Sequence, residues 1–215
     1  MQQNVCWSPA ILNSFATCPQ RFYRTQVLCD TKNLPSAAAD YSNQFHELLG
    51  QALVGNPFPK RFARFQRVVD IVRDLPGKHL VCKTLCVDRQ MKPCSLDKAW
   101  VKTTIDCVVA NGREAVLFFW KTGQKEPSDA SKLSAAIYFC LNHESVTIHV
   151  RTFWLRAGVV EKETFTRDQL PELWRTFVPA YRRLLEAHET GVWKATPCGF
   201  CKKYCEVKDC RFNGV

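Results

Sequence analysis

The sequence predicts an α/β (α+β) protein in which a mixed central sheet, containing an antiparallel hairpin, is flanked by helices. Three observations lead to this class. The period of the apolar residues changes from helical at both ends of the chain to two in the middle. Asn111-Gly112 separates two strand-like stretches and is the strongest short hairpin signal that a sequence can give. A helical stretch and a further strand follow the hairpin, which places strands between helices.

The N-terminal part is expected to form three helices. Ser8 is a good N-cap and Pro9 suits the first helical position, so the first helix covers residues 9–17 and stops before Cys18-Pro19. The second helix covers residues 37–54 and the third residues 59–74. The third is amphipathic, with a basic outer face. The candidates for nucleic-acid contact are Lys60, Arg61, Arg64 and Arg67 on this helix, with Arg21 and Arg24 before it. A solvated surface is the simpler interpretation of any single basic run.

The middle and C-terminal parts alternate strands and helices. Residues 80–88, 100–110, 114–121 and 145–155 are expected strands, and residues 131–142 an expected helix. Asp168 is a candidate cap for a long final helix, whose apolar residues keep the helical period from Leu170 to Leu185. If Asn111 and Gly112 form the hairpin turn, Asp106 lies opposite Leu117. Alternation then places residues 117, 119 and 121 on the same face as Asp106.

Length and composition indicate one folded domain. The chain has 215 residues, of which 46% are hydrophobic, so it can bury a core and is not disordered throughout. We therefore expect a single domain over residues 1–215 with a cysteine-rich tail at 198–215. No apolar run has membrane-spanning length, and the N-terminal residues lack the pattern of a secretory signal. A cytoplasmic protein with no membrane association is expected.

The charge balance favours an anionic partner. The 30 Lys and Arg residues against 20 Asp and Glu residues give a formal charge of +10. A polyanion, most simply nucleic acid, is the partner class that such an excess favours. The charge alone fits a basic protein without such a partner equally well.

The cysteines suggest a metal centre. Of 12 cysteines, four stand close together in the tail, at Cys198, Cys201, Cys205 and Cys210. Thiolates this close repel one another unless a cation holds them, so a metal or iron–sulfur site is expected. Either these four form a local zinc site, or three of them join a distant cysteine, for which Cys18 is the natural candidate. The cysteines at 6, 29, 86, 94, 107 and 140 have no ligand spacing and are interpreted as core thiols.

Several strings in the chain resemble a known family. They include Ser8-Pro9, Cys18-Pro19-Gln20-Arg21-Phe22-Tyr23, Phe45-His46-Glu47-Leu48, Ile105-Asp106, Trp120-Lys121-Thr122-Gly123, Arg167-Asp168-Gln169-Leu170-Pro171 and Cys205-Glu206-Val207-Lys208-Asp209-Cys210. Over almost its full length the chain resembles RecB/AddB-type nucleases of the PD-(D/E)XK superfamily, and more narrowly the short, phage-associated iron–sulfur exonucleases. The resemblance implies a restriction-endonuclease-like core. It also implies a four-iron, four-sulfur (4Fe-4S) cluster on Cys18, Cys201, Cys205 and Cys210 that joins the two ends, with Cys198 as an extra or substitute ligand.

The resemblance also shows where the catalytic pattern is broken. The family cleaves phosphodiesters with carboxylate-bound Mg²⁺ or Mn²⁺ and a lysine. Carried over, His46, Asp106 and Lys121 remain. Cys82 and Phe119 occupy the positions of two acids, and Lys132 that of a glutamine. Such a remnant is a poor Mg²⁺ site, because this ion prefers oxygen ligands. His46, Cys82 and Asp106 could instead form a softer Mn²⁺ or Zn²⁺ site.

These observations lead to a functional hypothesis with two alternatives. We expect a DNA-binding iron–sulfur protein of nuclease fold that has lost, or retains only weakly, the ability to cleave DNA. It would bind single strands or ends, alone or as a subunit of a replication or recombination assembly in a bacterial or phage-infected cell. The alternatives are an active exonuclease that uses His46, Asp106 and Lys121, and a module that binds an acidic protein.

Overall fold

A five-stranded sheet in the order β1-β2-β3-β4-β5 is the centre of the computed structural model, which describes residues 6–31 and 37–214. The strands are β1 (Lys78–Val87), β2 (Val101–Asn111), β3 (Glu114–Lys121), β4 (Thr147–Trp154) and β5 (Val159–Thr166). β3 and β4 are parallel and the other neighbours antiparallel. The parallel pair requires a crossover, which α5 (Ala130–Leu141) provides. The expected mixed sheet with an antiparallel hairpin is therefore confirmed; β5, by contrast, was not expected.

The N-terminal helices follow one another almost without a break. Ser8 caps α1 (Pro9–Thr17), because its side chain accepts a hydrogen bond from the Ile11 N–H. Cys18 ends α1 and is also the N-cap of α2 (Pro19–Phe22), whose chain continues into the π-helical turn η1 (Tyr23–Val27). The first helix stops before Cys18, as expected, and the proline after Cys18 starts a new helix.

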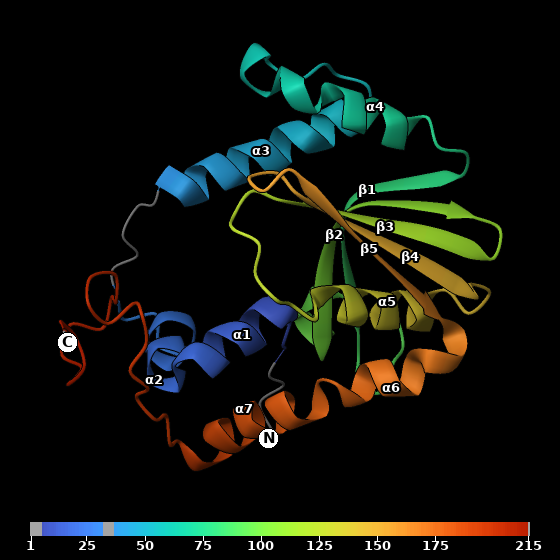
Figure 1. Ribbon diagram of the computed structural model, residues 1–215. Helices are drawn as coiled ribbons and strands as arrows, with labels where there is room; N and C mark the ends of the chain where they lie inside the picture. Colours follow the sequence, from blue (N-terminus) through green and yellow to red (C-terminus); the bar gives the residue numbers. More distant parts are fainter. Residues whose placement is uncertain (1–5, 32–36, 215) are drawn as a thin grey trace.

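One face of the sheet is covered by α3 (Ala37–Leu53) and α4 (Gln66–Arg73), as Figure 1 shows. The helix expected over residues 59–74 is divided into a 3-10 helix, η2 (Lys60–Phe65), and α4. The three-residue repeat of a 3-10 helix places Phe62 and Phe65 on one side. Both rings pack edge-on against Phe45 of α3, with centroids 5.5 and 5.4 Å away. Aromatic packing therefore accounts for the departure from the expected single helix.

The other face is covered by α5, α6 (Leu170–Arg175) and α7 (Val178–Thr190), with α1 beside them (Figure 1). The expected long final helix is wrong in two respects. Thr166, not Asp168, is the cap, and it forms a capping box with Gln169. The helix also breaks between Arg175 and Val178, because Pro179 lacks an N–H and its ring would clash with the carbonyl of Arg175 in a continuous helix.

The register of the hairpin differs from the expected one by two residues. Asn111 pairs with Glu114, so the turn consists of Gly112 and Arg113, and Leu117 lies opposite Val108 rather than Asp106. In the described part of the chain no helix is long and apolar enough to cross a membrane.

β1 and β2 also contain an irregularity that changes the direction of the Asp106 side chain. Ile105 and Val108 both face the apolar cluster under α5, although they are three residues apart, so the alternation is broken between them. The register lacks a Cys82–Asp106 pair at this point, and Cys82 has a positive φ of 49°. The expectation that Asp106 shares a face with residues 117 and 119 is therefore wrong, because Leu117 and Phe119 belong to the cluster under α5.

Candidate functional site

The junction of α1 and α2 meets the C-terminal tail at a group of cysteines. Cys18 lies between α1 and α2, and the tail after α7 returns beside α2 (Figure 1). The Cys18 sulfur accepts hydrogen bonds from the N–H groups of Arg21, at 3.5 Å, and of Thr196, at 3.4 Å. Thr196 is 178 residues away in sequence. Cys18 is therefore positioned by contacts from both ends of the chain.

The tail cysteines are held by short-range backbone turns. The Cys201 N–H donates to the Cys198 carbonyl, and the Gly214 N–H to the Cys201 carbonyl. The Asn213 side-chain amide donates to the carbonyls of Cys205 and Val207, at 3.2 and 3.1 Å. These bonds fold a segment with no regular secondary structure around its cysteines.

Within the tail, Cys198 and Cys201 lie close together. The Cys198 N–H donates to the Cys201 sulfur at 3.3 Å, and the two sulfurs are 3.9 Å apart. Burial raises the pKa of the Cys198 thiol above its usual range, and the charges of Cys201 and Cys18 raise it further. Cys18, Cys201 and Cys205 are buried, whereas Cys198 and Cys210 are partly exposed. The Cys210 thiol contacts the Gln20 side-chain oxygen at 3.5 Å.

Two ion pairs attach the tail to α2 and η1. Arg21 forms a two-point pair with Glu206, with Nε and Nη2 donating to the two carboxylate oxygens at 2.8 and 2.9 Å. Arg24 donates to Asp209 at 2.9 Å and to Asp30 at 2.6 Å. Arg21 also lies over the Phe200 ring, 4.7 Å from its centroid. The guanidinium groups of Arg21 and Arg24, which the sequence suggested for nucleic-acid contact, are thus engaged within the protein.

This donor set suits a thiophilic metal or cluster. Thiolates are the ligands of structural zinc and of iron–sulfur clusters, and N–H donors to sulfur stabilise the bound thiolates. Two thiolates on one tetrahedral zinc ion, with bonds of about 2.3 Å, lie about 3.8 Å apart, close to the Cys198–Cys201 separation. Within residues 6–31 and 37–214, no three Cys, His, Asp or Glu side chains are already gathered as a metal-binding group. The donor chemistry admits both of the ligand sets considered from the sequence.

The second candidate centre is the His46–Asp106 pair. Asp106 points toward α3, where His46 Nδ1 lies 2.9 Å from its Oδ1. Its other oxygen, Oδ2, accepts the Trp120 N–H at 2.8 Å, where β2 separates from β3. The side chains are 35% and 14% exposed, so solvent reaches the histidine more easily than the carboxylate. Both oxygens of the carboxylate already have partners in the protein.

Cys82 lies close to this pair. Its sulfur packs against α3 at Gly50, where an added Cβ would lie only 2.9 Å away. Burial, and then the negative charge of Asp106, raises the pKa of the Cys82 thiol. Burial raises the pKa of the neighbouring Cys107 to about 12, with smaller contributions from Cys82 and Asp106. These thiols therefore stay protonated at neutral pH.

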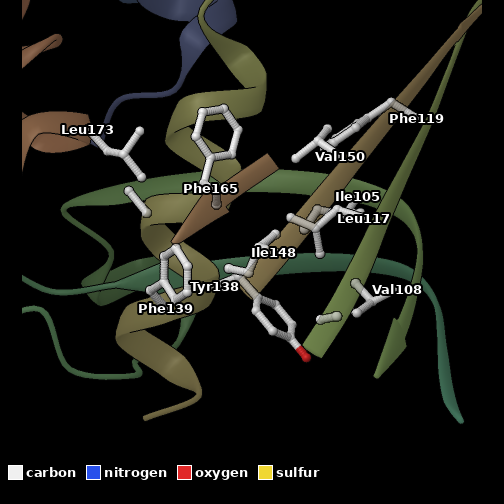
Figure 2. Close-up of a cluster of buried hydrophobic side chains, with 13 residues drawn as sticks. Ile105, Val108, Leu117, Phe119, Tyr138, Phe139, Ile148, Val150, Phe165 and Leu173 are labelled. Atoms are coloured by element: carbon white, nitrogen blue, oxygen red, sulfur yellow. The ribbon is translucent and has the colours of Figure 1, made fainter. Parts of the chain in front are cut away.

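Phe119 and Lys121 lie elsewhere, on the side of the sheet that α5 covers. Phe119 is 5% exposed and packs in the cluster with Val150 and Leu117, as Figure 2 shows. The Lys121 ammonium lies 5.5 Å from the centroid of its ring. Both residues line a cavity of about 410 Å³, bordered by the first turns of α1 and α5, and its described lining contains neither His46 nor Asp106. The structure thus separates His46 and Asp106 from Lys121, the three residues for which the resemblance implied a catalytic role.

The remaining candidates lie at the surface. Lys132 pairs with Asp129 at 2.7 Å at the start of α5. Lys60, Arg61, Arg64 and Arg67 are exposed on η2 and α4, and Arg61 and Arg64 each lie over the adjacent phenylalanine ring. Together these four residues form a basic surface on the α3–α4 layer.

Sequence reasoning missed the residues that hold the site together. The carboxylates of Glu206 and Asp209 stand among tail cysteines, and only the fold reveals their partners on α2 and η1.

Comparison with protein-family models and with curated proteins gives no match for this chain. Among solved structures, the crystal structure of SSO0001 is similar, with a TM-score of 0.51 and 13% sequence identity. The similarity covers 99% of this chain and 89% of that chain. At this identity it concerns the fold alone, and it means that the sheet and its flanking helices together form an arrangement already seen in a solved protein.

Proposed function

We propose that this chain is a DNA-binding protein of nuclease-like fold whose two ends are joined by a thiolate-ligated iron–sulfur cluster, and that it no longer cleaves DNA efficiently. The observation that carries the proposal is the contact of Cys18 with the tail at Thr196, together with the backbone N–H donors directed at the sulfurs of Cys18 and Cys201. Cys18, Cys201, Cys205 and Cys210 are the proposed ligands, with Cys198 as the alternative to Cys201. When bound, the cluster would fix the tail against α2.

The loss of cleavage is proposed from the separation of the remnant residues. A phosphodiesterase of this kind needs carboxylates and a lysine around one metal ion. Here Asp106 is engaged with His46 and Trp120, whereas Lys121 lies beside the buried Phe119. No second acid stands at residue 82 or 119. A soft metal at His46, Cys82 and Asp106 would leave Lys121 outside the site.

The cluster is tested on protein purified without oxygen. We expect a brown protein with broad absorption near about 400 nm and about four iron and four sulfide ions per chain. Cys205→Ser should remove the colour, whereas the matched change of the exposed Cys29 to Ser should keep it. Comparing Cys198→Ser with Cys201→Ser identifies the fourth ligand. A colourless protein with one zinc ion per chain would refute the iron–sulfur part of the proposal.

DNA binding and cleavage are tested separately with labelled single- and double-stranded DNA. We expect binding that weakens with salt, and a shallower salt dependence, by about one to two phosphate contacts, when Arg61 and Arg64 are changed to Ala. Arg182→Ala, on the opposite side of the sheet, should leave the slope unchanged. Cleavage in Mg²⁺ or Mn²⁺ that disappears in Asp106→Ala would instead identify an active exonuclease. Absence of salt-sensitive binding would favour an acidic protein as the partner.

A further inference from the structure

The cavity of about 410 Å³ between the sheet and the first turns of α1 and α5 has the features of a small-molecule site. It lies where β2 and β3 are no longer paired, beyond the Cys107–Phe118 pair. Phe119 and Trp154 supply aromatic rings to its lining, beside hydroxyl, amide and charged groups. Its volume and this mixture of apolar surface with a few polar groups are typical of cavities that bind small ligands.

The first turn of α5 offers donors at this cavity. The first N–H groups of a helix have no partner within the helix. Asp129 stands at the N-cap position but makes no capping hydrogen bond, and its carboxylate is paired with Lys132 at 2.7 Å. The Ser128 hydroxyl accepts the Ala130 N–H at 3.2 Å. Since Ala130 and Ser131 line the cavity, the positive end of the helix dipole is available there to a bound anionic group.

The Ser131 hydroxyl is a second and independent sign of a ligand. Ser131 is 6% exposed and lines the cavity, and its Oγ has no hydrogen-bond partner among the described residues. Ser134 and Ala135, one turn later on the same side of α5, both contact the sheet, and Ser134 Oγ lies 2.7 Å from Thr103 Oγ1. Ser131 therefore directs its hydroxyl toward the sheet, into the cavity. A buried polar atom without a partner destabilises the fold, and a ligand that accepts its hydrogen bond would remove that cost.

The charges around the cavity balance one another. The charged residues of the described lining are Lys102, Lys121, Glu126, Glu161 and Glu163. Glu161 is already engaged, because its two oxygens accept Lys125 Nζ and Trp154 Nε1, both at 2.6 Å. Two cations and two carboxylates then remain, so the lining favours neither a simple anion nor a simple cation.

We propose that this cavity binds a small zwitterion, with its carboxylate at the first turn of α5 and its ammonium at Glu163. The carboxylate would accept hydrogen bonds from the Ser131 hydroxyl and from N–H groups of the first turn. Glu163 is partly buried and forms no ion pair with another described residue, so its carboxylate is free to pair with the ammonium. A short apolar chain between the two charged groups would pack against Phe119 and Trp154.

ε-Aminocaproate is the probe, and caproate and hexylamine are its matched halves, each with one of the two charges. Titration calorimetry of the full chain measures the affinity of each compound. We expect the zwitterion to bind at least about tenfold more tightly than either half, because it makes both charged contacts. Caproate binding as tightly as ε-aminocaproate would overturn the proposal in favour of a plain anion site. Failure of both ε-aminocaproate and the shorter γ-aminobutyrate to bind would also overturn it.

Two variants assign the two ends of the ligand. Ser131→Ala should weaken ε-aminocaproate and caproate about tenfold and leave hexylamine unchanged. It should not lower Tm, because it removes a hydroxyl that has no partner. Glu163→Gln should weaken ε-aminocaproate and hexylamine but not caproate, and the exposed Glu172→Gln is the control that should change none of them. Equal weakening of all three compounds by either variant would contradict the assignment of the ends.

The test is independent of the proposed function. Salt-sensitive DNA binding should persist in Ser131→Ala and in saturating ε-aminocaproate, and a wild-type protein that fails to bind DNA should still bind the zwitterion. Displacement of ε-aminocaproate by single-stranded DNA would refute the proposal, because the cavity would then belong to the DNA-binding surface.

Discussion

The carboxylate of Asp106 has a structural task that is independent of any chemistry. It is hydrogen-bonded to His46 Nδ1 and accepts a hydrogen bond from the Trp120 N–H, at the point where β2 separates from β3. We predict that Asp106→Ala lowers the free energy of unfolding by about 1–3 kcal/mol, because a backbone donor loses its partner. Urea denaturation measures this loss. Changing the exposed Asp168 to Ala should cost less than about 0.5 kcal/mol, and an equal cost in the two variants would contradict the prediction.

Phe119 stands at a position where the resemblance implies a carboxylate. By the resemblance, Asp at position 119 and Glu at position 82 would complete the set of acids. In the structure Phe119 is 5% exposed within the apolar cluster under α5. We predict that Phe119→Asp costs at least about 3 kcal/mol, because it removes a buried ring and buries a carboxylate.

The matched variant for this prediction is Phe119→Leu, which keeps an apolar side chain and should cost about 1–2 kcal/mol. Thermal unfolding of both variants, with and without Cys82→Glu, provides the measurement. We expect the acid-restored double variant to unfold before it gains activity. A Phe119→Asp protein as stable as Phe119→Leu would show that residue 119 reaches solvent.

At the scale of elements, Arg167 fixes the end of α5. Its guanidinium donates to the backbone carbonyls of Phe139, Asn142 and Ser145, and it lies 5.0 Å from the centroid of the Phe139 ring. We predict that Arg167→Ala costs about 2–3 kcal/mol, and that Arg167→Lys recovers less than half of this, because an ammonium lacks the planar fork. Chemical denaturation tests both. Arg175 forms an exposed ion pair with Glu172, so Arg175→Ala should leave the free energy of unfolding almost unchanged.

The attachment of the tail to α2 should depend on pH. The Arg21 guanidinium, through its hydrogen bonds, holds the pKa of Glu206 below its ordinary value. Because the folded-state pKa is depressed, the pair stabilises the fold above the ordinary glutamate pKa and loses its effect as pH falls through the lowered value. We predict that Glu206→Gln costs about 1–2 kcal/mol at about pH 6, and that this cost shrinks steadily as pH falls below the ordinary glutamate pKa. The exposed Glu172→Gln is the control, and a pH-independent cost would contradict the assignment.

The comparison of sequence and structure shows which elements were predictable. The ends of α1 and α5 were predicted to within one residue, and for α1 the Ser8 cap and Pro9 provided the signal. The final helix was not, because a proline at residue 179 fits the first turn of a new helix as well as the end of an old one. The strand β5 escaped notice because Phe165 is its one buried residue and three charged residues occupy its middle, so it lacks an apolar alternation.

The candidate site was predictable only in part, for a related reason. Local spacing revealed the tail cysteines, since four in a short segment are unusual. The division of Asp106 from Lys121 depends on a break in strand alternation and on a hairpin turn one residue later than expected. Such breaks are set by packing against α3 and α5, which the alternation of a single strand does not encode.

At the scale of the whole molecule, the cysteine group closes nearly the entire chain. The contact between Thr196 and Cys18 spans 178 residues, and all five strands lie inside this loop. A cross-link across a loop of this length removes about 5 kcal/mol of conformational free energy from the unfolded state in the chain-entropy model. Ligation at the ends would therefore stabilise strands that lie far from any cysteine.

We accordingly predict that removal of the proposed metal centre destabilises the whole domain and not the tail alone. For a chain of this size, about 5 kcal/mol corresponds to a fall in Tm of about 10–20 °C. Calorimetry of the protein as isolated and after treatment with a chelator measures the fall, and Cys205→Ser should reproduce it. Cys29→Ser should melt like the wild type before and after treatment. A fall in Tm below about 3 °C, with loss of the tail contacts only, would contradict the prediction. It would mean that the sheet and its helices are stable without the link between Cys18 and the tail. That result is expected if the unfolded chain already keeps these two segments near each other.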